Sequence, residues 1–265
     1  MKKLGIIFVL IFMLLVGIHF CLAPKSGEFV ESDMLENIKS RGVLKVGINS
    51  DSKPYGFIDS NGNYAGYDVD LARYIAQYIV NNPNGVEFVS VTPSNRLLKA
   101  STGEVDIVIS TVTITPFREQ VVNFSVPYDV AGQAILVKSN SSITSLTDLN
   151  GQNVGVIFGT TAEKNMKKLV PNANLLGFST YKDAYNALKA DRINAITSDD
   201  TILSRFTYYD KSVKLLPKRY SREPYGIAFK KSESAIKFKE SLDFAIEDLQ
   251  RKNVIQRLRK KWGIL

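Results

Sequence analysis

Apolar runs that suit buried strands alternate with amphipathic helical stretches along most of this chain of 265 residues. The run "VDIVI" (105–109) shows no alternation of polar and apolar residues, which is typical of a strand buried on both faces of a parallel sheet. The stretch "YDVDLARYIAQYIV" (67–80) instead has its apolar residues at helical spacing: Val69, Ala72, Ala76 and Ile79. The alternation predicts an α/β fold with parallel strands.

A partial internal echo predicts that this plan occurs twice. Residues 97–110, "LLKASTGEVDIVIS", are matched by residues 187–198, "ALKADRINAITS", and each reads as helix, polar turn, strand and then Ser. Two α/β lobes of similar plan are therefore expected. Two apolar stripes predict helices near the C-terminus: Ala235, Phe238, Leu242, Ala245 and Leu249, then Ile255, Leu258 and Trp262.

The distribution of His and Cys excludes several kinds of catalytic and metal site. The chain has one of each, His19 and Cys21, so the body beyond residue 21 has neither. This rules out Ser-His-Asp and Cys-His catalysis, His/Cys zinc sites and disulfides there. No carboxylates have calcium-loop spacing, so neither a metal nor a cofactor is expected.

The first 25 residues predict export. Two lysines precede an apolar run from Leu4 to about Ile18, as in a secretory leader or an uncleaved anchor. Cys21 matches the lipid-attachment Cys of bacterial lipoproteins, although Phe20 stands where that pattern has a small residue. Lipid anchoring at Cys21, an uncleaved membrane anchor and another cleavage site all remain open.

The net charge of +8 is spread along the chain and is densest near the end, at "RKNVIQRLRKKWG". Nucleic acid is one possible partner for such a segment, but a solvated helix face is the interpretation we favour, so no nucleic-acid partner is expected.

Ligands of open parallel sheets gather at the carboxyl ends of the strands. After "VDIVI" come Ser110, Thr111 and Thr113, and Arg118 follows five residues beyond Thr113. Hydroxyls donate and accept hydrogen bonds, and a guanidinium matches a carboxylate with its planar fork. This strand end suits the carboxylate of a small molecule; taken alone it could equally be a polar surface loop.

Two later strand ends add complementary chemistry. "GTTAE" opens a predicted helix that Thr160 or Thr161 would cap, and free amides at a helix start attract an anion. "SDD" ends the second copy, where Asp199 or Asp200 could balance an ammonium group. An amino acid carries α-carboxylate and α-ammonium on one carbon, so together these strand ends predict an amino-acid site.

The same segments resemble the amino-acid-binding proteins of bacterial ABC importers, solute-binding family 3. The resemblance covers about residues 33–263 and includes, in order, "GYDVDLA", "GEVDIVISTVTITPFREQVVNFSVPY", "GTTAE", "INAITSDDTIL" and "EPYGIAFKK". It implies a two-lobed type II periplasmic-binding fold with crossings at about 127–132 and 221–226. Lobe 1 would comprise 33–127 with 225–265, and lobe 2 would comprise 128–224.

The resemblance also implies roles for individual residues. Arg118 would grip the ligand's α-carboxylate with Thr113 beside it, and the amide of Thr161 (or Thr160) would close from lobe 2. Asp199, helped by Ser110, would pair with the α-ammonium. The resemblance further implies that Thr111, Tyr55 and Tyr225 lie near the ligand.

Ligand identity depends on Arg96, which matches an arginine that reads the side-chain carboxylate in members binding glutamate or aspartate. Asn49 departs from the acidic-ligand pattern, because some of those members carry lysine there. Glutamate or aspartate is expected, and glutamine or asparagine remains the alternative. Arg96 as a surface helix residue is the other interpretation.

The expected partners are a small amino acid and a membrane permease on another chain, with transport powered by an ATPase and the binding protein itself a monomer. No catalytic residues are expected. Two rival functions stay open on this fold: a dehydratase acting on cyclic acids, which needs a general base over the ligand carbon, and a ligand sensor.

Overall fold

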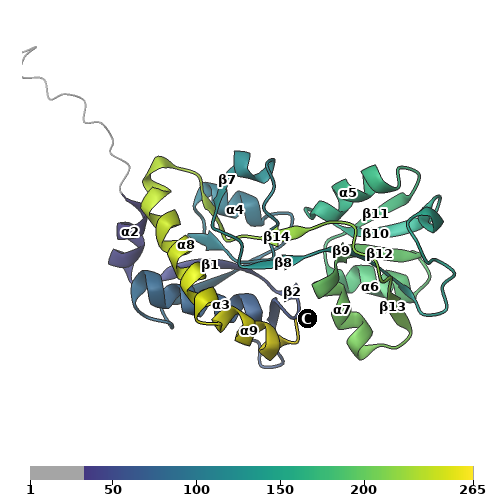
Figure 1. The fold of residues 1–265 in the computed structure, drawn as a ribbon, viewed down its shortest axis with the longest axis horizontal. Helices are drawn as coiled ribbons and strands as arrows, with labels where there is room; N and C mark the ends of the chain where they lie inside the picture. The colour runs from purple at the N-terminus through teal and green to yellow at the C-terminus, as the bar shows by residue number, and fades with distance from the viewer. Residues whose placement is uncertain (1–32, 265) are drawn as a thin grey trace, which may run out of the picture. The chain divides into compact units, whose positions relative to one another are not determined.

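The computed structural model describes residues 33–264, so the predicted leader, Cys21 and its anchoring lie outside the described residues. Two five-stranded sheets organise this part of the chain (Figure 1). The first sheet, which defines lobe 1, has the strand order β5 (Val86–Val91), β1 (Leu44–Asn49), β6 (Ile107–Val108), β15 (Ala228–Lys230) and β7 (Val122–Phe124). The second, which defines lobe 2, has the order β11 (Asn174–Phe178), β10 (Asn153–Ile157), β12 (Ala195–Asp199), β9 (Gln133–Lys138) and β13 (Val213–Leu215).

The two sheets share one plan, as the internal echo predicts. In each echo copy a helix leads into the central strand of its sheet, β6 in lobe 1 and β12 in lobe 2. The expectation of parallel strands is wrong for one strand per sheet: β15 pairs antiparallel with β6 and β7, and β9 pairs antiparallel with β12 and β13. The reason is that the chain enters both strands directly from a crossing between the lobes, at the end of the sheet where the parallel strands finish.

The crossings form a sheet of their own. Strand β8 (Asp129–Ala131) pairs antiparallel with β14 (Glu223–Tyr225), with Tyr225 opposite Asp129. Figure 1 shows both strands running between the two groups of elements. They coincide with the crossings expected at about 127–132 and 221–226, whereas the sequence-derived limits of the lobes, 33–127 with 225–265 and 128–224, stay a prediction.

Helices cover both sheets. In lobe 1, α3 (Tyr67–Val80) and α4 (Arg96–Thr102) pack on the strands, and α3 has the limits expected from its periodicity. In lobe 2, α5 (Thr161–Leu169) lies on one side of the sheet, and α6 (Tyr181–Lys189) and α7 (Asp200–Tyr209) lie on the other (Figure 1). The remaining helical segments are α2 (Met34–Arg41), η1 (Arg118–Gln120), η2 (Thr147–Leu149), η3 (Glu233–Ala235), α8 (Ile236–Arg251) and α9 (Val254–Trp262).

The predicted C-terminal stripes are confirmed. All five residues of the first stripe are buried, on α8 and just before it, and Ile255 and Leu258 of α9 are buried as well. No helix within residues 33–264 combines the length and the apolar character that a membrane span requires.

The connection between β1 and α3 contains a small antiparallel sheet of β2 (Asp51–Ser52), β3 (Gly56–Ile58) and β4 (Tyr64–Ala65). Strands of two or three residues are too short to show a periodic pattern in the sequence.

Candidate functional site

The loop that follows β6 presents its hydroxyl residues beside the crossing strand β14. Thr113 forms an isolated antiparallel bridge with Tyr225, and the amide of Gly226 donates to the carbonyl of Val112 at 3.0 Å. Ser110, Thr111 and Thr113 are buried, and the hydroxyl of Ser110 has no hydrogen-bond partner among the described residues. A buried hydroxyl without a partner costs free energy, so this one is available to a ligand.

Arg118 is buried and is anchored in both lobes. Its Nη1 donates to the carbonyl of Thr113 at 2.8 Å, and its Nη2 donates to the carbonyl of Gly159, in lobe 2, at 3.0 Å. Burial lowers the pKa of Arg118 to about 10, and the positive charge of Arg96 adds to this effect. The interpretation of Arg118 as part of a polar surface loop is therefore wrong.

Arg96 opens α4 and has a side chain that is 3% exposed, so it is not a surface helix residue. Its Nη1 donates to the carbonyls of Ser110 and Thr111, whereas its Nε has no partner. Within residues 33–264 no ion pair joins it to an acidic side chain. Burial lowers its pKa, and the negative charge of Asp199 is among the influences that oppose this shift.

The start of α5 faces lobe 1 with two threonines. Thr160 occupies the N-cap position, but its hydroxyl donates to the carbonyl of Ile157 at 2.7 Å instead of capping the helix. The hydroxyl of Thr161 donates to Glu223 of β14 at 2.9 Å. Neither hydroxyl is hydrogen bonded to a helix amide, which leaves the first-turn amides of α5 as potential anion donors.

Asp199, rather than Asp200, faces the two arginines. It is the last residue of β12, is buried, and accepts a hydrogen bond from the hydroxyl of Tyr225. Burial raises the pKa of Asp199 to about 7. Asp200 instead accepts the amide of Gly132 and pairs with Arg219 at 2.7 Å, so its carboxylate is already neutralised.

Tyr55 and Tyr225 lie in a buried tyrosine cluster at the crossings. Their rings are 5.6 Å apart in an edge-to-face arrangement, and the hydroxyl of Tyr55 donates to Asp129 of β8 at 2.9 Å. Tyr128, which precedes β8, stacks with Tyr67 in the same cluster. The hydroxyl of Tyr55 is thus committed to the crossing strand, and the predicted ligand contact for this residue remains a prediction.

Several residues around the site were not predicted from the sequence. Asp68 is buried and accepts from the hydroxyl of Tyr128 at 3.2 Å, and the same hydroxyl accepts the amide of Thr111 at 3.1 Å. Tyr181, on α6, places its hydroxyl 3.1 Å from the hydroxyl of Ser198, next to Asp199. "GYDVDLA" contained a sequence signal for Asp68, whereas nothing around Tyr181 distinguished it from other helix residues.

Together these residues form a buried dipolar site between the lobes. Two guanidiniums stand on the lobe 1 side, and a carboxylate and the start of a helix stand on the lobe 2 side. The arrangement can bind a zwitterion, because a guanidinium can pair with the carboxylate of the ligand and Asp199 with its ammonium group. No cluster of three or more His, Cys, Asp or Glu that could hold a metal ion occurs in residues 33–264.

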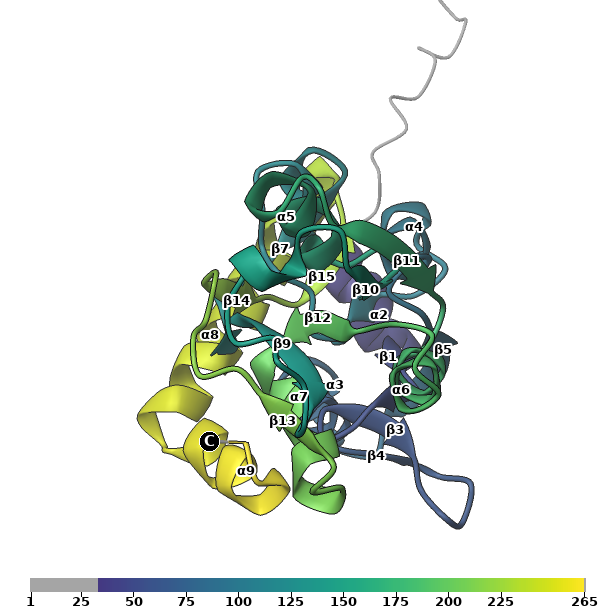
Figure 2. The same ribbon diagram turned by 90° about the vertical axis from the view of Figure 1, so that its right-hand side faces the viewer.

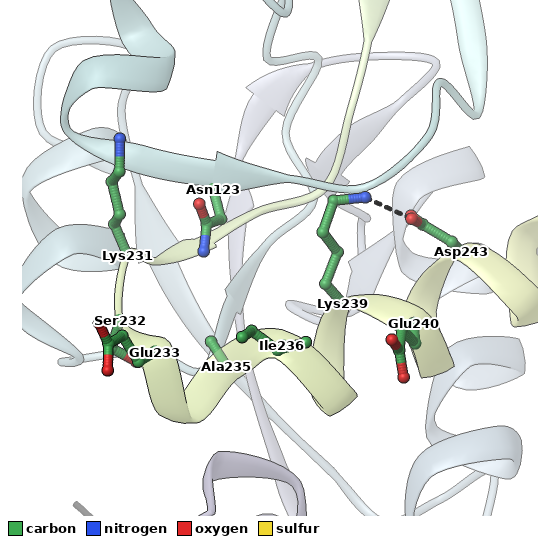
Figure 3. Close-up of a pocket in the computed structure, with 9 residues that line it drawn as sticks. All are labelled: Asn123, Lys231, Ser232, Glu233, Ala235, Ile236, Lys239, Glu240 and Asp243. Carbon is green, nitrogen blue, oxygen red and sulfur yellow. Dashed lines mark hydrogen bonds and ion pairs between the residues drawn. The ribbon is translucent and has the colours of Figure 1, made fainter.

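A separate groove lies on lobe 1, away from this site. Figure 3 shows it beside η3 and α8. Its volume is about 530 Å³. Both of its lysines have partners: Lys239 pairs with Asp243, and Lys231 donates to the carbonyl of Glu119. We assign no function to this groove.

The fold and the site define a class of two-lobed binding protein, and comparison with known proteins identifies its family. Residues 44–264 match the bacterial extracellular solute-binding proteins, family 3, and the chain belongs to this family. It has the type II periplasmic-binding fold and is the exported substrate-binding protein of an amino-acid ABC transporter.

Similar proteins carry the names of amino-acid-binding proteins. The chain is 38% identical over 198 residues to the glutamine-binding protein of Geobacillus stearothermophilus, covering 74% of this chain and 76% of that protein. It is 32% identical over 234 residues to the ABC transporter glutamine-binding protein GlnH of Bacillus subtilis, covering 88% and 85%. The solved structure of the ancestral amino acid-binding protein AncCDT-1, a precursor of cyclohexadienyl dehydratase, matches with a TM-score of 0.80 and 33% identity, covering 86% and 98%.

Proposed function

We propose that the protein captures glutamate or aspartate between its lobes and delivers it to a membrane permease. The α-carboxylate binds Arg118, the hydroxyl of Thr113 and the amide of Thr161 or Thr160. The α-ammonium binds Asp199 and the hydroxyl of Ser110, while Thr111 and Tyr225 complete the surroundings. Arg96 binds the side-chain carboxylate.

The observation that carries this proposal is the state of Arg96. A buried cation is costly unless an anion or a full set of acceptors surrounds it. Arg96 has two carbonyl acceptors, an Nε without a partner and no acidic ion-pair partner in residues 33–264. The side-chain carboxylate of an acidic amino acid supplies the missing anion, whereas a neutral amide offers only an oxygen acceptor.

Glutamine is the second candidate, and the names of the relatives favour it. An arginine also donates to an amide oxygen, so the contact with Arg96 survives in weaker form. Asn49 fits either ligand: it is buried, and its Oδ1 accepts the amide of Asp51 at 2.8 Å, so it is committed to the turn after β1.

Closure of the lobes explains capture and release. The ligand binds lobe 1 first, then completes its contacts with lobe 2, and thereby stabilises the closed form by differential binding. Micromolar affinity requires about −8 kcal/mol, which charge-assisted hydrogen bonds at both ends of a small amino acid supply. The closed monomer, held at the membrane through Cys21 or an uncleaved leader, then docks on the permease.

The test is calorimetric titration of the purified protein, freed of bound ligand, with glutamate, aspartate, glutamine, asparagine, arginine and histidine. Glutamate or aspartate should bind most tightly. Arg96→Gln should weaken the binding of these acids by about tenfold or more relative to the binding of glutamine and asparagine. Arg118→Gln should weaken the binding of every ligand, because all of them share the α-carboxylate. Arg73→Gln, a half-exposed arginine on α3, serves as the control.

Each other outcome points to a different function. Tight glutamine binding that Arg96→Gln leaves unchanged would show that glutamine is the ligand and that Arg96 does not contact it. Binding of none of the six amino acids would favour the enzyme or the sensor. Analysis of products after incubation with cyclic acids, for which AncCDT-1 gives the precedent, would then identify the enzyme.

A further inference from the structure

Asp51 crosses from lobe 1 to lobe 2 and contacts the start of α6. Its Oδ2 accepts the amide of Tyr181 at 2.7 Å and the amide of Lys182 at 3.3 Å. Figure 2 shows α6 next to β3, the strand that pairs with β2, which carries Asp51. A carboxylate at a helix N-terminus is favourable, because it meets unpaired amides and the positive end of the helix dipole.

The helix start is prepared for this contact. The first four amides of a helix lack partners within the helix. The first bond of α6 joins the amide of Ala184 to the carbonyl of Thr180, the N-cap, at 3.3 Å, and the hydroxyl of Thr180 takes the amide of Asp183 at 3.0 Å. Asp51 binds the amides of Tyr181 and Lys182, the first two residues of the helix. The N-terminus of α6 is therefore capped from both lobes, by Thr180 of lobe 2 and by the carboxylate of Asp51 from lobe 1.

A cation from α7 holds Asp51 from the other side. Arg205 places Nη2 3.9 Å from Oδ1 of Asp51 and donates through Nη1 to the carbonyl of Asp51 at 3.4 Å. Burial lowers the pKa of Arg205, and the charge of Asp51 opposes that shift. Two elements of lobe 2 thus converge on one side chain of lobe 1.

Tyr181 links this contact to the ligand site. Its amide is bound by Asp51, while its buried side chain reaches Ser198 at the end of β12. Burial raises the pKa of its phenol, the negative charge of Asp199 adds to this shift, and the positive charge of Arg96 opposes it. Where α6 sits relative to lobe 1 therefore decides where the phenol of Tyr181 sits relative to Arg96.

We propose that Asp51 is a positioning residue for ligand capture: it clamps the start of α6 to lobe 1, holds Tyr181 at the side-chain end of the site and slows ligand release. The effect on release rests on the proposed function, whereas the clamp itself does not. The contact between Asp51 and α6 joins the two lobes without involving any group of the ligand.

Hydrogen exchange of the protein without added amino acid tests the clamp directly. Asp51→Ala should speed exchange of the Tyr181 and Lys182 amides by about tenfold or more, because they lose their acceptor. Asp51→Asn keeps an acceptor oxygen without the charge and should show an intermediate effect. Equal exchange in Asp51→Ala and the unaltered protein would overturn the proposal whether or not any ligand binds.

Dissociation kinetics test the effect on capture. With the tightest-binding amino acid, Asp51→Ala should release ligand about tenfold faster, with Asp51→Asn between it and the unaltered protein, and association should change by less than about twofold. A release rate that is the same in all three proteins would overturn the positioning role.

Asp59→Asn is the matched control. The carboxylate of Asp59 also accepts two amides, those of Asn61 and Asn63 at 2.9 Å each, but both lie in its own turn in lobe 1. It should leave both the exchange of the α6 amides and the release rate unchanged. A release rate raised equally by Asp59→Asn would show that loosening lobe 1 suffices, and would overturn the clamp.

Discussion

The hydroxyl of Tyr225, on the crossing strand β14, donates a hydrogen bond to Oδ2 of Asp199 at the end of β12 in lobe 2. Both side chains are buried. The crossing that links the lobes is thus bonded directly to the carboxylate proposed to hold the ligand's ammonium group. One hydrogen bond therefore joins the crossing to the proposed ligand site.

Ligand affinity should depend on pH through Asp199. Burial raises its pKa to about 7, and only the ionised form pairs with an α-ammonium. Affinity should therefore fall by up to about tenfold per unit as pH drops below about 7, and binding in that range should release a proton. Calorimetry in buffers of different ionisation enthalpy measures both effects. Asp199→Asn should bind weakly at every pH; affinity that is constant between about pH 5 and pH 8 would contradict the assignment.

Asp68 should make the folded state less stable as pH rises. Burial is the main cause that raises its pKa to about 8, from an ordinary value near 3.8. Between these values the unfolded chain has lost the proton and the folded protein keeps it. The free energy of unfolding therefore falls with rising pH across this window, and the contribution is fully present below about pH 4.

Denaturant unfolding at several pH values tests this contribution. Asp68→Asn keeps an acceptor for Tyr128, so the stability of the variant should improve relative to the unaltered protein between about pH 4 and pH 8. Asp148→Asn is the control, because amide and hydroxyl donors lower the pKa of Asp148 and place its titration below this window. A constant difference between Asp68→Asn and the unaltered protein would contradict the prediction.

Gly159 should be required for closure of the lobes. It has a φ of +79°, and a Cβ built there would lie 2.3 Å from the carbonyl oxygen of Pro93 in lobe 1. Gly159→Ala should lower ligand affinity by more than about tenfold, because the lobes must separate to admit the methyl group. Gly151→Ala isolates the backbone strain: Gly151 has a φ of +70°, with no atom within 4 Å of the added Cβ. Equal affinity losses in the two variants would point to strain alone.

At position 111 a glycine variant should be more stable than an alanine variant, the reverse of the usual order. Its φ is 48°, in the left-handed region that favours glycine, and its amide donates to Tyr128. Thr111→Gly should be more stable than Thr111→Ala by about 1 kcal/mol in denaturant unfolding. At Ser101, inside α4, the free energy of unfolding of the alanine variant should instead exceed that of the glycine variant by about 0.5–1 kcal/mol. Finding Ala more stable at both positions would contradict the prediction.

Much of the local structure could be predicted from the sequence, because it depends on neighbours along the chain. The apolar spacing of 67–80 predicted α3 with its observed limits, and Gly103, after α4, adopts the left-handed conformation of a helix end. The strand-end residues Ser110, Thr113 and Asp199 could be named because parallel strands finish at one edge of a sheet. The sheet of β2, β3 and β4 could not be predicted, because its strands are too short to show a period.

The contacts that complete the site could not be predicted, since they join residues far apart in the sequence. Nothing around Asp51 indicates that it caps a helix 130 residues later, and nothing around Glu223 indicates a bond to Thr161. The burial of Arg96 is of the same kind. The sequence places Arg96 22 residues before Arg118, but its carbonyl partners and its unpartnered Nε depend on how the loop after β6 packs.

The sequence by itself determined the strands and helices, the repeated plan of two lobes and the kinds of side chain at the strand ends, because short-range periodicity and the direction of parallel strands are sufficient for these. The tertiary structure decided which charges are buried, which are already paired and which stay available. The physical reason is that desolvation and pairing depend on groups brought together from both lobes. Asp199 shows this: its place in "SDD" made it a candidate, but it is burial that raises its pKa, against the opposing effect of the hydrogen bond from Tyr225. Burial and that bond distinguish it from Asp200, which pairs with Arg219.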